Sequence, residues 1–428
     1  MALNKASGKE IFGWAMFDFA NSSFTTVIVT VIFSAYFVSH IVGDKILGVK
    51  YWGWGLIISN IIVIFSGPII GAVADFSGSK KKFLFLTSLL CIISTALLFF
   101  AGEGDLIYSL IIFIVANSAF AAGENFCASF LPEIAHPDEM GRVSGYGWAF
   151  GYIGGLLSLM LCLSIFHIWG TGETQIRSAF LVTALFFLLS ALPTFLLLKE
   201  RSIKRSLQEG KGYFSTGLGR IKESFCDVQD FGELIKFLLV FLVYSCGIYT
   251  VIAFSSIYVE NVLHFNKTES LVFFIVIQIS SSLGAFIFGF IEDWIGTKKT
   301  ISISLIIWLV VIVGAYLTSS KQIFWIIGNL AGLAIGSSQS SSRAMVALFT
   351  PQSKSAEFFG LWGMSSRLAA IAGIFSFSAI TTLSGSMKNA LLATAIFFLA
   401  GLFGLLFIDE KKGAMSACGY TDKIKISD

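Results

Sequence analysis

Four charged residues stand inside long apolar stretches of this chain, where they could carry protons or bind an ionic solute. They are Asp18, Glu124, Arg343 and Arg367. A carboxylate in such a place can take up a proton, and a guanidinium group can hold a carboxylate. A charge at the bilayer centre costs about 2.5–3.5 kcal/mol on insertion scales, so each of these residues needs a partner, an aqueous cavity or a function.

The elements that carry these charges are predicted to be membrane-spanning helices. Hydrophobic residues make up 56% of the 428 residues and charged residues only 13%, which excludes a soluble globular domain. The apolar stretches run for about 20 residues without strand-like alternation, which favours an all-α membrane protein over a β-barrel. We expect twelve helices, at approximately 11–39, 51–75, 83–101, 106–131, 141–166, 176–198, 236–262, 268–292, 299–318, 322–349, 358–384 and 388–408.

A loop motif that occurs twice indicates a tandem duplication. The pattern Gly-x3-Asp-x2-Gly-x-Lys-Lys ends two apolar stretches, and its copies are 218 positions apart. The glycines permit close helix contact and a tight turn. We predict that the aspartates, at helix ends, lock one conformation through neighbouring helix ends, with Arg142 as the partner of Asp75. The copies are Gly71, Asp75, Gly78 and Lys80, and Gly289, Asp293, Gly296 and Lys298.

The duplication also relates two of the intramembrane charges. Glu124 and Arg343 are 219 positions apart, as are Pro132 and Pro351. A pseudo-twofold axis would therefore place Glu124 and Arg343 on opposite walls of a central cavity. At about 1.5 Å per residue, all four charges form one layer about 10–14 Å from their helix ends.

Two interpretations of this layer stay open. In the first, Glu124 or Asp18 takes up a proton and Arg343 holds a substrate carboxylate. In the second, Glu124 and Arg343 form a salt bridge that closes a gate and never touches substrate. Asn21 lies on the same helical face as Asp18, and Gln339 lies one turn before Arg343, so both helices present a polar face to the substrate or proton site.

The distribution of basic residues predicts the orientation. Six of the 29 Lys and Arg residues fall in the predicted outer loops, two lie within helices, and the remaining 21 are on the side of both termini. Because loops rich in Lys and Arg stay in the cytoplasm, we expect both termini there, in a bacterial inner membrane or a eukaryotic vacuolar membrane. The predicted parts are an N-terminal six-helix bundle at 1–198, a basic linker at 199–235, a C-terminal six-helix bundle at 236–410 and a disordered cytoplasmic tail at 411–428.

The duplicated motif resembles the loop signature of the major facilitator superfamily. The resemblance implies two six-helix bundles related by an axis along the membrane normal, with the substrate site between them near the midplane. The first, fourth, seventh and tenth helices are expected to line it. The stretches 14–22, 130–135 and 141–155, and the frame of Gln339, Arg343 and Pro351, resemble one branch of this superfamily, which includes the autophagy-related vacuolar amino-acid effluxers and their bacterial relatives.

Three features depart from that branch. Its members commonly carry Asn-Asp-Gly where this chain has Ser245, Cys246 and Gly247. Glu124 occupies a position that is expected to be apolar, and Leu348 stands where a second arginine is usual. The departures indicate that a carboxylate has moved from the seventh helix to the fourth, which changes the charges of the cavity.

The expected function is secondary active transport of a small polar solute, such as an amino acid, by rocking of the two bundles. Proton coupling is expected because the chain has no Gly-x4-Gly-Lys-Ser/Thr loop for a nucleotide. The alternative is a receptor or scaffold that does not transport, in which the intramembrane charges only pair with one another. The sequence predicts no enzyme, cofactor, metal or nucleic-acid partner, and a monomer whose partners are the solute, protons and membrane lipids.

Overall fold

The computed structural model describes residues 6–170, 172–202 and 228–427, and nearly all of them are helical. The first long helix is continuous from Gly8 to Ile41 but includes two wider π-helical segments. The elements of the first half are α1 (Gly8–Ser23), η1 (Phe24–Val31), α2 (Ile32–Tyr36), η2 (Phe37–Ile41), α3 (Lys45–Ser77), α4 (Lys80–Leu97), η3 (Leu98–Phe100), α5 (Leu106–Ala128), α6 (Leu131–Ile134), η4 (Pro137–Glu139), α7 (Met140–Trp169) and α8 (Glu173–Leu197).

The second half repeats this order. Its elements are α10 (Val228–Asn261), α11 (Lys267–Ile295), α12 (Thr297–Leu317), α13 (Lys321–Leu348), η5 (Gln352–Lys354), α14 (Ser355–Ser384), α15 (Met387–Ala393), α16 (Ala395–Leu406) and α17 (Glu410–Ser427). Among the described residues, eleven helices are long and apolar enough to cross a membrane. With α13, which is more polar because of its serines, they make the twelve that the sequence predicts. Most of the predicted linker lies outside the described residues.

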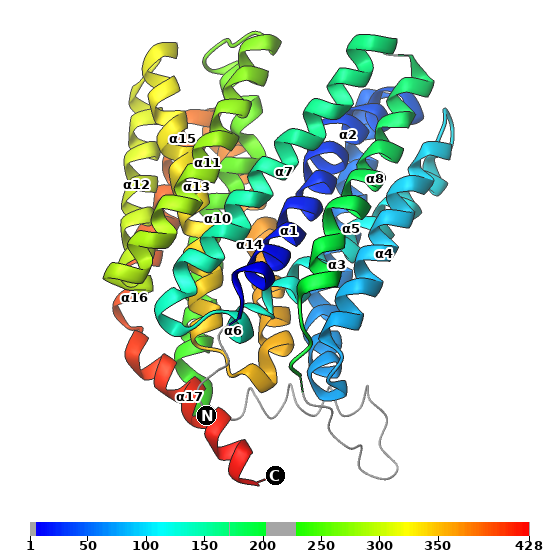
Figure 1. Cartoon of the computed structure of the whole chain (residues 1–428). Coiled ribbons are helices and arrows are strands. Elements are labelled where there is room, and N and C mark those ends of the chain that lie inside the picture. Colours follow the sequence, from blue (N-terminus) through cyan, green and yellow to red (C-terminus); the bar gives the residue numbers. More distant parts are fainter. Residues whose placement is uncertain (1–5, 171, 203–227, 428) are drawn as a thin grey trace.

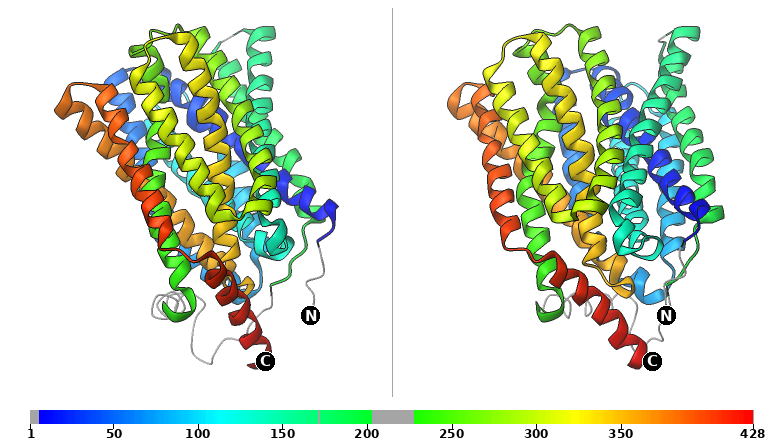
Figure 2. Two further views of the ribbon diagram at one scale, coloured as in Figure 1. Left: turned by 90° about the vertical axis from the view of Figure 1, so that its left-hand side faces the viewer. Right: turned by 60° about the vertical axis from the view of Figure 1, so that its left-hand side comes forward.

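The helices form two bundles that converge near the chain termini and splay apart at the opposite end (Figure 1). The views in Figure 2 place α17 and both termini at the converging end. There, α3 packs on α14 and α11 packs on α7, so that the duplication makes one inter-bundle contact twice. Glycines allow this approach. A Cβ atom at Gly289 would lie 2.9 Å from the carbonyl oxygen of Gly141, and one at Gly71 would overlap the carbonyl oxygen of Ala356.

The prediction of a disordered tail is wrong. Residues 410–427 form α17, which packs on α10 and α13. The Glu410 carboxylate accepts hydrogen bonds from the backbone N–H groups of Thr297 and Lys298 at 2.9 and 3.1 Å, and so caps the first turn of α12. The Tyr420 ring lies 5.1 Å from that of Phe231. A polar segment is thus ordered by tertiary contacts.

Candidate functional site

A cavity of about 790 Å³ lies between the two bundles. Residues of α1, α5, α10 and α13 line it, as expected for the first, fourth, seventh and tenth long helices, and residues of η1, α7, α11, α12, α14 and α15 contribute the rest of the wall. The π-helical η1 contributes Thr25, Thr26 and Thr30. All four intramembrane charges, Asp18, Glu124, Arg343 and Arg367, line the cavity.

The structure pairs these charges differently from the sequence prediction. Arg343 Nη1 donates to Asp18 Oδ2 at 2.6 Å, and Arg367 Nη2 donates to Glu124 Oε2 at 3.2 Å. The interpretation in which Glu124 and Arg343 form the salt bridge, one of the two left open by the sequence, is therefore wrong. The equal depth of Glu124 and Arg343 and the pseudo-symmetry correctly predicted that both line the cavity. The rotation of each helix about its axis, however, directs the two side chains to other partners. Both observed pairs cross from one bundle to the other.

Arg343 is held on every side by the N-terminal bundle. Besides Asp18, its guanidinium donates from Nε to Ser144 Oγ at 3.1 Å and from Nη2 to the Ser144 carbonyl at 2.7 Å. Its Cζ lies 4.8 and 5.4 Å from the ring centroids of Trp14 and Trp148, within the range of cation–π attraction. The side chain is only 2% exposed. All three guanidinium nitrogens donate to the N-terminal bundle, so Arg343 is suited to holding the two bundles together.

The second pair is looser. The side chains of Arg367 and Glu124 are 22% and 25% exposed, and the structure shows a single hydrogen bond between them. Arg367 Nε has no hydrogen-bond partner among the described residues. This pair can therefore exchange its mutual contact for contacts with a solute at a modest cost.

Other polar atoms on the cavity wall are also without partners. The Nε1 atoms of Trp148 and Trp362, Asn125 Nδ2 and Asn21 Oδ1 are buried and make no hydrogen bond within the part of the chain that the structure describes. Buried polar groups are nearly always hydrogen-bonded, so a cluster of unpaired ones marks a place where solvent or a ligand binds. Donors outnumber acceptors here, which favours a ligand rich in acceptor atoms.

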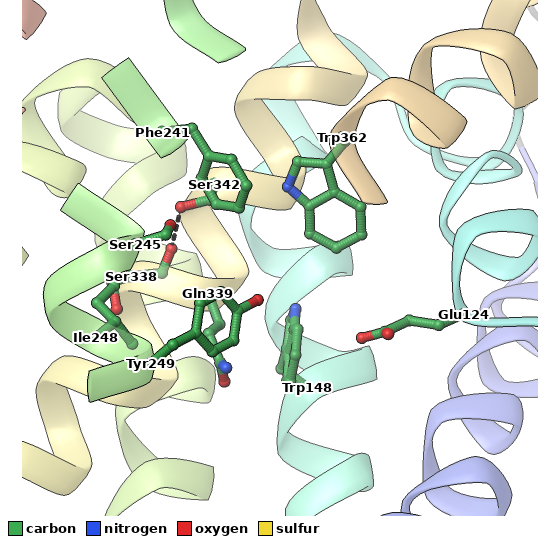
Figure 3. Close-up of a pocket in the computed structure, with 10 residues that line it drawn as sticks. All are labelled: Glu124, Trp148, Phe241, Ser245, Ile248, Tyr249, Ser338, Gln339, Ser342 and Trp362. Atoms are coloured by element: carbon green, nitrogen blue, oxygen red, sulfur yellow. Dashed lines mark hydrogen bonds between the residues drawn. The ribbon is translucent and has the colours of Figure 1, made fainter. Parts of the chain in front are cut away.

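A small recess of about 20 Å³, large enough for a water molecule, opens beside this cluster. Figure 3 shows Glu124 pointing from α5 toward Trp148 and Trp362, with Tyr249 and Gln339 on the opposite side. Ser245 lines the same recess as Glu124. Gln339 is partly committed, because the Tyr152 hydroxyl donates to its Oε1.

Sequence reasoning missed the two tryptophans and Asn125. Tryptophan in membrane proteins is enriched at the interface, so a tryptophan two turns inside a helix end is a signal for another role. Trp148 and Trp362 lie about that far into α7 and α14. Asn125, directly after Glu124, makes a polar doublet in an apolar helix.

The loop motifs close the converging end. Asp75 accepts hydrogen bonds from the N–H groups of Ala356 and Glu357, in the first turn of α14, at 3.1 and 2.8 Å. Asp293 accepts from Gly141 and Arg142, in the first turn of α7, at 2.9 and 3.3 Å. Each carboxylate thus satisfies unpaired N–H groups at a helix N-terminus of the other bundle, where negative charge is favoured.

The remaining motif residues support this closure. Lys80 is fully buried, pairs with Glu133 and donates to Ser355 Oγ of the other bundle at 2.6 Å. Gly78 and Gly296 adopt φ angles of 61° and 95°, which the turn requires, and Lys298 Nζ donates to the Ile408 carbonyl. Arg142, predicted to pair with Asp75, instead lies with Nε 3.6 Å from Asp293 Oδ2.

Neutralising either member of the Asp18–Arg343 pair should destabilise the protein strongly. Asp18→Asn or Arg343→Gln leaves one buried charge unpaired, at a cost of about 3–5 kcal/mol, and the double variant should regain part of that loss. Thermal unfolding of the purified protein measures this coupling. The Glu124→Gln and Arg367→Gln cycle, at the more exposed pair, should give a coupling of about 1 kcal/mol or less. Equal couplings in the two cycles would contradict this distinction.

Comparison with solved structures places the fold in a known class. The human organic anion transporter MFSD10 (TETRAN) matches with a TM-score of 0.77 at 15% identity, over 93% of this chain and 99% of that one. The proton:xylose symporter XylE matches with a TM-score of 0.73 at 14% identity, over 95% and 96%. The two-bundle fold with its central cavity is that of a major facilitator superfamily transporter.

Within that superfamily, the chain belongs to the Atg22-like vacuole effluxer family, whose sequence model matches residues 56–418. The uncharacterized MFS-type transporter YxiO of Bacillus subtilis (strain 168) is 25% identical over 410 residues, which cover 94% of this chain and 95% of YxiO. Autophagy-related protein 22 of Yarrowia lipolytica (strain CLIB 122 / E 150) is 21% identical over 332 residues, or 70% of this chain and 55% of that protein.

Proposed function

We propose that this protein is a secondary active transporter for a small zwitterionic solute, such as an amino acid, and that Glu124 and Arg367 bind it. The observation that carries the proposal is the set of unpaired donors around this looser ion pair. Arg367 Nε and the indole N–H groups of Trp148 and Trp362 are free to receive a carboxylate. Glu124, on the same cavity wall, can receive the ammonium group.

Substrate binding and conformational change are coupled in this proposal. A solute that inserts between Glu124 and Arg367 replaces an inter-bundle ion pair with its own two charges. The Asp18–Arg343 pair and the motif aspartates hold the converging end closed meanwhile. Release of these contacts opens the cavity on the other side, which is alternating access by rocking of the two bundles.

Proton coupling would use Glu124. In the absence of solute its charge is balanced by Arg367, and a proton can take the place of that partner when the bundles separate. Asp18, the other candidate for this role from the sequence, is 12% exposed and bound to Arg343, so we assign it to closure of the gate. The alternative of a receptor that does not transport is disfavoured, because the charges line a solute-sized cavity as well as pairing.

Reconstituted protein tests the proposal directly. Proteoliposomes should take up or release members of an amino-acid panel, and a pH gradient should drive accumulation. Glu124→Gln should remove the effect of the pH gradient and also weaken exchange, because the amide cannot balance the charge of the ammonium group. Absence of flux for every zwitterion, with flux for uncharged or purely anionic solutes, would refute the proposed substrate class.

The proposed orientation gives a labelling prediction. Cysteines introduced in place of Lys45 and Thr174, at the splayed end, should react with an impermeant maleimide added to intact cells. Cysteines in place of Lys82 and Lys411, at the converging end, should react only after permeabilisation, since basic loops stay in the cytoplasm. Reaction of Lys82→Cys in intact cells would reverse the topology. With this topology the cavity opens to the outside.

A further inference from the structure

Glu292, which precedes Asp293 in the second loop motif, is a buried acid without a recorded cation partner among the described residues. The residue is only 2% exposed to solvent. Neither carboxylate oxygen has a hydrogen-bond partner of good geometry within the described residues, although the Ser341 and Thr297 hydroxyls lie close enough to favour its charged form, and the structure records no ion pair for it there. The mechanism above makes no use of this group.

The other bundle covers Glu292. A Cβ atom at Gly141, in the first turn of α7, would lie 2.7–2.8 Å from the Cβ, Cγ and Cδ atoms of Glu292. The carboxyl group is therefore sealed where α7 and α11 meet at the converging end. The side chains of Thr297 on α12 and Ser341 on α13 lie beside it. Separation of the two bundles at this end would expose it to water.

The charged groups near Glu292 do not compensate it. The charged neighbours that act on it most strongly are the carboxylates of Asp293 on α11 and Glu410 on α17. Two cations of the surrounding elements are directed elsewhere: Arg142 of α7 pairs with Glu139 and Asp293, and Lys298 of α12 donates to the Ile408 carbonyl. An ionised Glu292 would thus be a buried negative charge beside two others. Such a charge costs several kcal/mol, so the closed interface requires the neutral acid.

The fold does not require an acid at this position. The residue 218 positions earlier, at the equivalent place in the first repeat, is Ala74, which is also buried. Glu133 offers a contrast, because it is equally buried but pairs with Lys80. Two buried acids at the same end of the molecule therefore differ in the protonation state that stabilises the closed interface. Glu133 stabilises it when charged, and Glu292 stabilises it when neutral.

We propose that Glu292 is a proton-binding site that couples closure of the converging end to the uptake of one proton. The carboxylate takes a proton from the solution on the side of the termini as α7 covers it. It returns the proton to the same solution when α7 and α11 separate. The site thus senses the pH on that side and adds no net transfer of protons across the membrane. This inference rests on the alternating access proposed above.

The sign of the pH effect follows from linkage. The closed state holds one more proton than the open state, so acid favours closure and alkali favours opening at this end. The ratio of closed to open molecules should change by up to about tenfold per pH unit where the site titrates.

Spin labels on the two bundles can measure this ratio. Cysteines in place of Lys82 and Lys299, in a background without the native cysteines, report the distance across the converging end in lipid nanodiscs. For the parent protein we expect the closed population to fall as pH rises. Glu292→Gln and Glu292→Ala, which restores the residue of the first repeat, should remain closed at every pH. An infrared band of a protonated carboxyl group should be present in the closed parent and lost in Glu292→Gln.

Two variants serve as controls. Glu133→Gln removes the carboxylate that pairs with Lys80, so it should weaken closure and keep the pH response. Asp293→Asn should also keep it, which separates Glu292 from its neighbour. A pH response that survives in both Glu292 variants, or a parent protein without one, would overturn the proposal. The flux assay and the spin-label measurement test separate proposals. If the solutes are not transported but the pH response depends on Glu292, only the proposed substrate class is refuted. If they are transported but the pH response does not depend on Glu292, only the proposed proton site is refuted.

Discussion

Arg367→Gln should abolish transport of a carboxylate-bearing solute while the protein stays folded. The substitution removes a charged donor that we assign to the solute, and such contacts contribute about 2–3 kcal/mol, which corresponds to a loss of about 30- to 150-fold in apparent affinity. Little stability should be lost, because the Glu124–Arg367 pair is partly exposed. Binding by calorimetry and flux in proteoliposomes measure the two effects.

The controls for this result use the same ion pair. Arg367→Lys keeps the charge but loses the planar fork, so it should retain part of the affinity. The double variant with Glu124→Gln should not restore transport, since both groups are proposed to bind the solute. Recovery of flux in the double variant would make the pair a gate and remove it from the binding site.

Gly71→Ala should prevent closure of the converging end. The added methyl group would overlap the carbonyl oxygen of Ala356, in the first turn of α14, so the bundles could not approach as the structure shows. We expect a tenfold or greater loss of transport and a longer distance between labels at Lys82→Cys and Lys299→Cys. Large effects are expected because backbone atoms cannot move aside as a side chain can.

Gly67 on the same helix provides a matched control. A Cβ atom there would lie 3.4 Å from the nearest atom, the carbonyl oxygen of Gly360, which is an ordinary contact. Gly67→Ala changes helix propensity in the same way but should leave closure and flux nearly unchanged. Equal losses in the two variants would show that closure does not depend on the contact at Gly71.

The sequence predicted the layer of charges but not their partners. Apolar stretches and the prolines after the fourth and tenth helices locate Asp18, Glu124 and Arg343 along their helices. The choice of partner depends on the rotation of each helix and on side-chain reach, which the repeat offset does not contain. Arg343 reaches across to Asp18 because Ser144 and the rings of Trp14 and Trp148 guide it there.

The sequence did not predict that residues 410–427 form the ordered helix α17, for a different reason. Its residues are polar overall, and its order comes from distant groups. Gly413 lets the ring of Phe349 approach the helix, and Glu410 caps α12. None of these contacts leaves a periodic signal in residues 410–427. The role of the duplicated glycines could be predicted from the sequence, because the same close contact between helices is required twice in one chain.

The serines of α13 have a consequence for biosynthesis. Ser337, Ser338, Ser340, Ser341 and Ser342 are all buried, and Arg343 follows them directly. Arginine alone disfavours insertion by about 2.5–3.5 kcal/mol, against about 0.3–0.6 kcal/mol gained from each leucine or isoleucine near the helix centre. This segment therefore gains little by entering lipid alone. It packs against α11 and α12, which are synthesised before it. These two helices must therefore remain next to the insertion machinery when α13 leaves it. The second bundle thus begins to assemble before its last helices are synthesised.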